Sequence, residues 1–180
     1  MAMERGQRTD LATWRAAHVD ALRLAGALQP AATVFRLYAG RLKYYPQSGV
    51  HGPLGTDLLD AMTAVRETLA AITALAARWD EEITWLRTID PTMLLDDIQR
   101  GHAAARETAG LLRAALDVFD RTVAHPDMAT LDAPYGAGAP RRVHPGAQCT
   151  WVAERADGVA RQVTSVTLRK ENLLLNVRPR

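Results

Sequence analysis

A long run of apolar residues at alternating spacings of four and three most constrains how this 180-residue chain can fold. The run consists of Leu58, Met62, Val65, Leu69, Ile72, Ala76, Trp79, Ile83 and Leu86. Such spacing places these side chains along one side of a helix of about four heptads. Thr56 precedes the run as a suitable N-cap, so the pattern predicts a helix over about residues 56–89.

A second run with the same rhythm follows almost at once. It consists of Leu95, Ile98, His102, Ala105, Ala109, Leu112, Leu116, Phe119 and Val123. Asp90 suits an N-cap and Pro91 suits the first helical position, so we expect a helix over 91–124. The short connection predicts a long antiparallel αα-hairpin. Residues at the same height in the two helices then have numbers that sum to about 181, which sets His102 opposite Trp79.

Two further segments are predicted to complete an all-α helical bundle in one domain, residues 1–180. Residues 11–42 follow the same rhythm with smaller side chains, and Pro30 interrupts them, so we expect a kinked N-terminal helix. Valines and an alanine at heptad spacing predict a fourth helix within 149–177, although Asp157-Gly158 and the stretch VTSVT leave a β-hairpin open. Residues 125–148, between the third and fourth predicted helices, are rich in proline and glycine and predict a long crossover.

The net charge of +2 conceals an uneven distribution of charge. Residues 1–55 carry seven basic and three acidic residues, residues 56–140 carry seven and fourteen, and residues 141–180 carry eight and three. Basic ends are typical of nucleic-acid binders. An acidic middle can equally pair with basic ends within the fold or between copies, and the sequence leaves both interpretations open.

The end of the first helix combines cations with aromatic rings. Together with two arginines of the crossover, the candidate nucleic-acid or phosphate-binding residues are Arg36, Arg41, Lys43, Tyr44, Tyr45, Arg141 and Arg142. Cations can contact the phosphate backbone, and tyrosine rings can stack on bases. The alternative is that the tyrosines continue the apolar stripe while the cations favour the negative end of the helix dipole.

His18, His102 and Trp79 are predicted to share one layer inside the bundle. Such a layer could bind a small ligand or a metal ion, or it could hold hydrogen-bonded core histidines. The paired Glu-x-x-His spacing of metal sites in helical bundles is absent, so we assign no metal ligand and no cofactor.

No catalytic motif of known type occurs in the sequence, which favours a protein that is not an enzyme. Cys149 is the single cysteine, the first residues lack the apolar stretch of a secretory signal, and no segment is apolar enough to span a membrane, so we expect a cytoplasmic protein. The two long apolar runs favour an interaction protein, self-associating or an accessory subunit of a larger assembly with a protein partner. Nucleic-acid binding is the first alternative, and a ligand or metal bundle around His18 and His102 is the second.

Overall fold

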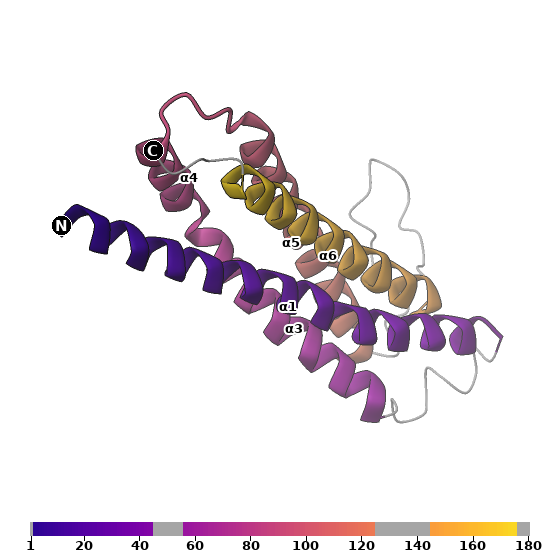
Figure 1. The fold of residues 1–180 in the computed structure, drawn as a ribbon. Coiled ribbons are helices and arrows are strands. Elements are labelled where there is room, and N and C mark those ends of the chain that lie inside the picture. The colour runs from indigo at the N-terminus through magenta and orange to yellow at the C-terminus, as the bar shows by residue number, and fades with distance from the viewer. Residues whose placement is uncertain (1, 45–55, 125–144, 176–180) are drawn as a thin grey trace.

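The computed structural model describes residues 2–44, 56–124 and 145–175, and these ranges contain helices and no strand. The helices are α1 (Ala2–Tyr44), α3 (Thr56–Ala77), α4 (Trp79–Ile89), α5 (Asp96–Ala124) and α6 (Pro145–Leu175). Figure 1 shows α1, α3, α5 and α6 side by side along a common axis, with α1 running the length of the molecule. The predicted all-α bundle is therefore confirmed.

Helix α6 is the fourth helix of the bundle. It packs against α1 and α5, while α3 also packs against α1 and α5, so α1 and α5 lie on a diagonal. Neighbouring helices run in opposite directions (Figure 1). Asp157 and Gly158 lie in the middle of α6, which excludes the alternative β-hairpin. Gly158 is instead explained by packing, because a Cβ atom there would come within 2.9 Å of Thr108 on α5.

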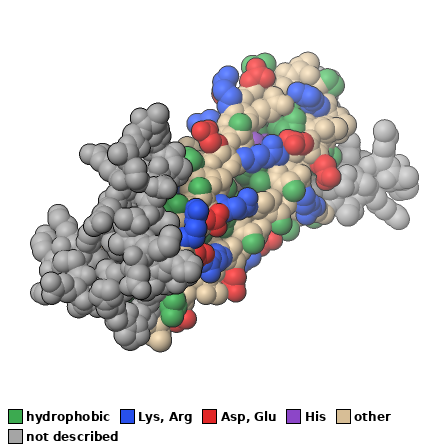
Figure 2. Space-filling view, turned by 180° about the vertical axis from the view of Figure 1, so that it is seen from behind, with side chains coloured by type: hydrophobic (Ala, Val, Ile, Leu, Met, Phe, Trp, Pro, Cys, Tyr) green, Lys and Arg blue, Asp and Glu red, His purple; other side chains and the backbone are tan. Residues whose placement is uncertain are grey.

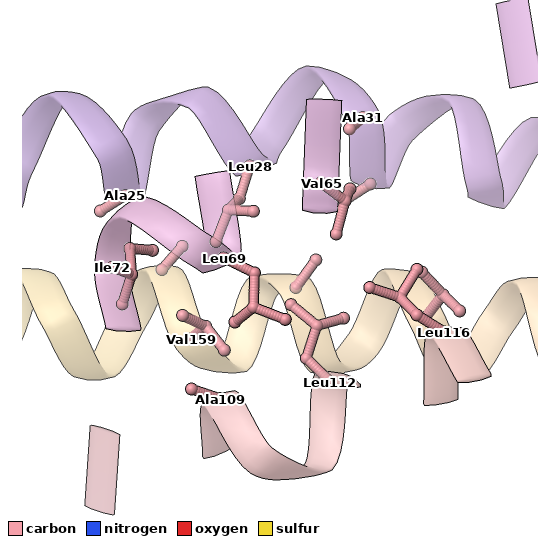
Figure 3. Close-up of a cluster of buried hydrophobic side chains, with 14 of the residues drawn as sticks. Ala25, Leu28, Ala31, Val65, Leu69, Ile72, Ala109, Leu112, Leu116 and Val159 are labelled. Carbon is pink, nitrogen blue, oxygen red and sulfur yellow. The ribbon is translucent and has the colours of Figure 1, made fainter. Parts of the chain in front are cut away.

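Small and branched apolar side chains from all four sides of the bundle fill the core. Figure 3 shows Ala25, Leu28 and Ala31 of α1 facing Val65 and Leu69 of α3, Leu112 and Leu116 of α5, and Val159 of α6. Alanines on α1 and α6 let these helices approach closely, which explains why the heptad pattern of α1 uses such small residues. The apolar runs that predicted the helices are thus the residues that form the core.

The predicted hairpin is confirmed, with an interruption in its first helix and a later start of its second helix. The helix expected over 56–89 is interrupted at Arg78, whose N–H donates to the Leu75 carbonyl at 3.1 Å. The guanidinium of Arg106 on α5 donates to the Ala76 carbonyl at 2.8 Å, so a backbone carbonyl at the interruption is hydrogen-bonded by a side chain of another helix.

Helix α5 begins at Asp96, so the predicted start at Pro91 was wrong. Asp90 follows α4 in an extended conformation and does not cap α5. Its carboxylate accepts from the backbone N–H of Thr92 at 2.9 Å and from the Thr92 hydroxyl at 2.6 Å. This local turn competes with helix formation, which explains the later start.

α1 continues through Pro30, so the helix is kinked there and not broken. The crossover expected over 125–148 is shorter, because Pro145 already begins α6, and residues 125–144 lie outside the described residues. No helix in the described ranges is both long and apolar enough to cross a membrane.

Candidate ligand-binding site

Four polar side chains, one from each side of the bundle, form a layer in its interior: His18, Glu82, His102 and Lys170. We call these four residues the polar layer. They lie at the level where the large apolar cluster ends and a smaller cluster around Ile83, Leu95 and Ile98 begins. The predicted register is confirmed at this level, because the His102 ring stacks on the Trp79 ring with centroids 4.4 Å apart.

An ion pair between α4 and α6 is the centre of the polar layer. The Lys170 side chain is only 3% exposed, and its ammonium group donates to Oε2 of Glu82 at 2.6 Å. Burial lowers the pKa of Lys170, and the charge and hydrogen bond of Glu82 oppose that shift. The ammonium also lies 5.7 Å from the centroid of Trp79, whose ring face attracts cations. The pair therefore gives each buried charge a partner.

His102 is the most enclosed member of the polar layer, with 2% of its surface exposed. Its Nε2 atom lies 3.9 Å from Oε2 of Glu82, and within the described part of the chain neither ring nitrogen has a hydrogen-bond partner. Burial, followed by the charges of Lys170 and Arg106, lowers the pKa of His102 to about 3. The imidazole is therefore neutral at pH 7.

His18 is held between two backbone carbonyl groups. Its Nε2 atom is 3.0 Å from the Thr167 oxygen on α6, and its Nδ1 atom is 3.3 Å from the Trp14 oxygen. A neutral imidazole has a single N–H, so it can donate to only one of these carbonyls. Burial and the charge of Lys170 lower the pKa of His18, against the effects of Glu82 and the two carbonyls. The shorter distance favours donation to Thr167.

Two tryptophans bridge α1 and α4 beside the polar layer. α3 packs along α1, but α4 leans away from α1 beyond the interruption at Arg78 (Figure 1). Trp14 and Trp85 lie in the resulting space, with ring centroids 6.2 Å apart. The Trp14 ring also packs on His18, at 3.7 Å between centroids.

Cavities lie on both sides of this tryptophan pair. The larger one, the open-end groove, has a volume of about 750 Å³ and runs between α1, α4 and α6. Its walls are mainly apolar and include Leu11, Val19, Leu22, Ile89, Leu174 and Leu175. His18, Arg15 and Glu171 supply its polar groups. The smaller one, the side cavity, has a volume of about 250 Å³ and is bounded by Trp14, Trp85, Arg78 and Glu82.

Of the predicted histidine layer, the structure brings His102 and Trp79 into contact, and His18 and His102 each lie near the Lys170 ammonium group. The rings of His102 and Trp79 stack, as the heptad spacing indicated, whereas His18 contacts Trp14 and the Thr167 carbonyl. No group of three or more histidine, cysteine, aspartate or glutamate side chains in the described ranges could hold a metal ion. Lys170 forms an ion pair with the Glu82 carboxylate.

Two residues at the other end of α1, Arg36 and Tyr38, contact neighbouring helices. Arg36 forms an ion pair with Asp157 of α6. The Tyr38 hydroxyl donates to Asp57 of α3 at 2.6 Å, and the Arg41 guanidinium lies 5.2 Å from the Tyr38 ring centroid. These contacts leave fewer cations for a phosphate backbone. They also show that part of the basic N-terminal segment pairs with acidic residues of the same chain.

The other candidate residues of this surface lie at the end of α1 and in the two connections that follow α1 and α5. Lys43 and Tyr44 belong to the last turn of α1, and Tyr45, Arg141 and Arg142 lie outside the described residues. On the face seen in Figure 2, basic and acidic side chains are interspersed over the described residues. Cys149 is buried, and burial raises the pKa of its thiol to about 12.

Sequence reasoning missed Lys170 and the groove beside it. The heptad positions Val152, Ala156, Val159, Val163 and Val166 continue with a spacing of four to residue 170, so the pattern itself pointed to Lys170. Trp85 had no such signal, because its role depends on the angle that α4 adopts.

Comparisons with protein families, with curated proteins and with solved structures find no match to this chain.

Proposed function

We propose that this protein is a binding protein that holds a small apolar molecule in the open-end groove. The observation that carries the proposal is the groove itself: about 750 Å³ between α1, α4 and α6, with mostly apolar walls and a few polar groups. Pockets for small molecules typically have this size, this kind of lining, and a position between helices of a bundle.

Side chains at the edge of the groove support this proposal. Val19 is 66% exposed and Leu175 is also exposed, and both line the groove together with Leu22. Contiguous apolar surface in water is unfavourable, by about 25 cal/mol for each Å². A bound apolar molecule would cover these side chains and remove part of that surface from water.

A neutral fluorescent probe tests the proposal. N-phenyl-1-naphthylamine fluoresces strongly in apolar surroundings, so it should show saturable binding with a stoichiometry of one. Val19→Glu should weaken binding about tenfold or more, because a carboxylate would be placed at the groove wall.

The matched control is Leu37→Glu. Leu37 lies on the same helix and is 59% exposed, but it does not line the groove, so this variant should bind the probe like the wild type. Binding without saturation, or an equal loss in both variants, would contradict the proposal.

Self-association through the same apolar end is the second candidate, in keeping with the interaction protein expected from the sequence. The exposure of Val19, Leu22 and Leu175 favours it, since a second copy could cover them. Sedimentation at low and high salt distinguishes the two candidates. A dimer that Val19→Glu dissociates would assign the groove to an interface, and a monomer under both conditions would leave it to a small molecule.

A further inference from the structure

The open-end groove has one positive and one negative side chain on facing helices. Arg15 of α1 and Glu171 of α6 both line it, and both residues are exposed. The contact of 3.0 Å between His18 Nε2 and the Thr167 carbonyl shows how these two antiparallel helices align (Figure 1). Arg15 lies three residues before His18, about one helical turn toward the end of the bundle where α6 ends. Glu171 lies four residues after Thr167, about one turn toward the same end, so the two charges lie at nearly the same level of the groove.

The two charges do not pair with each other. Within the part of the chain that the structure describes, neither Arg15 nor Glu171 forms an ion pair. Behind the groove, the charges of Glu82 and Lys170 balance one another. Burial and the charge of Lys170 lower the pKa of His18, so its imidazole, which also lines the groove, is neutral at pH 7. The charges of the described side chains that line the groove therefore sum to zero, with the positive one on α1 and the negative one on α6.

This arrangement favours one kind of head group over the others. A head group with a single charge would be attracted by one wall and repelled by the other, and an uncharged head group would gain from neither wall. A zwitterionic head group can place its negative part beside Arg15 and its positive part beside Glu171. The apolar walls on both sides of this level, which include Leu11 and Leu174 on one side and Val19 on the other, can hold a hydrocarbon chain.

We infer that the molecule held in the groove is a zwitterionic amphiphile, whose head group lies between Arg15 and Glu171 and whose hydrocarbon chain lies along the apolar walls. This inference rests on the proposed function and specifies its ligand. Pairs of exposed charges contribute little in water, so the head group should change the affinity only severalfold. Burial of the hydrocarbon chain supplies most of the affinity.

Four amphiphiles with twelve-carbon chains test the inference through displacement of N-phenyl-1-naphthylamine from the full chain. Dodecylphosphocholine is zwitterionic, dodecyltrimethylammonium is cationic, dodecanoate is anionic and dodecyl maltoside is uncharged. Each compound is used below the concentration at which it forms micelles. Dodecylphosphocholine should displace the probe at a concentration about three- to tenfold lower than the other three, because it alone gains from both walls.

Neutralising one wall should change the preference in a defined direction. Arg15→Gln leaves Glu171 at the groove, so the cationic amphiphile should bind more tightly than the anionic one. Glu171→Gln leaves Arg15 and should reverse this order. The matched controls are Arg41→Gln and Glu154→Gln, which make the same charge changes on the same helices away from the groove and should keep the wild-type preference. All four residues are exposed, so each variant should fold like the wild type.

The possible failures can be told apart. Equal displacement by all four amphiphiles, or the same order of preference in Arg15→Gln and Glu171→Gln, would overturn the zwitterion assignment and leave the groove as a binding site. Absence of saturable binding of N-phenyl-1-naphthylamine and of every amphiphile would overturn the proposed function and this inference together. A dimer under the same conditions would then assign the groove to a second copy of the chain.

Discussion

Lowering the pH should destabilise the fold through the buried imidazole of His102. Its pKa is about 3 in the folded protein and 6.5 in the unfolded chain. Below pH 6.5 the unfolded chain therefore binds a proton that the folded protein does not accept. The folded state loses stability as the pH falls from 6.5 towards 3, and this contribution is fully present only above 6.5.

The environment of His102 explains the size of this effect. Burial is the main cause, Lys170 of α6 and Arg106 of α5 repel a proton, and Asp80 of α4 only partly compensates. Glu82 is 3.9 Å away and already paired with Lys170. Each pH unit below 6.5 should remove about 1.4 kcal/mol, so about 2–3 kcal/mol is lost between pH 7 and about pH 4.5.

Urea unfolding, followed by far-ultraviolet circular dichroism, measures this loss. His102→Leu removes the titrating group and keeps an apolar side chain of similar size, while all other groups titrate as before. The variant should lose about 2–3 kcal/mol less than the wild type between pH 7 and about pH 4.5. Parallel losses in the two proteins would refute the reasoning, because they would show that His102 takes up a proton equally in both states.

Two other features give predictions that chemical or thermal unfolding at neutral pH can check. Lys170→Met leaves the Glu82 carboxylate without its partner and should destabilise the fold by about 3 kcal/mol or more. Adding Glu82→Gln to this variant should recover most of the lost stability, and a Lys170→Met variant as stable as the wild type would contradict the reasoning. Gly101→Ala would place a Cβ atom 2.9 Å from Val166 and should destabilise by about 1–3 kcal/mol. Gly110→Ala, on the same helix with no atom within 4 Å, should stabilise by about 0.5–1 kcal/mol, and the same sign for both glycines would be the contrary result.

Periodicity was sufficient to predict the helices and one contact between them. Apolar spacing of four and three defines which side of a helix is buried, and a short connection limits the register of the next helix. This reasoning placed Trp79 opposite His102, and the two rings stack. It also favoured a helix at the C-terminal end, where a β-branched stretch alone would have suggested strands.

Other features of the fold could not be predicted from the spacing of apolar residues. Asp90 has the residue type of an N-cap, but its carboxylate stabilises a local turn with Thr92 instead. Lys170 continues a heptad run, but a lysine is normally assigned to the surface unless its partner is known. The open-end groove arises from the direction of α4 after Arg78, and helix direction is not encoded in apolar spacing.

The unequal apolar clusters on the two sides of the polar layer have a consequence for kinetics. Of the described residues, the large cluster contains 27 buried side chains and the small one, between α4, α5 and α6, contains five. The end with the smaller cluster can therefore open locally at a lower free energy than the whole molecule needs to unfold. A molecule in the groove could then enter and leave through such partial opening, with an exchange rate set by a few side chains while the main core stays intact.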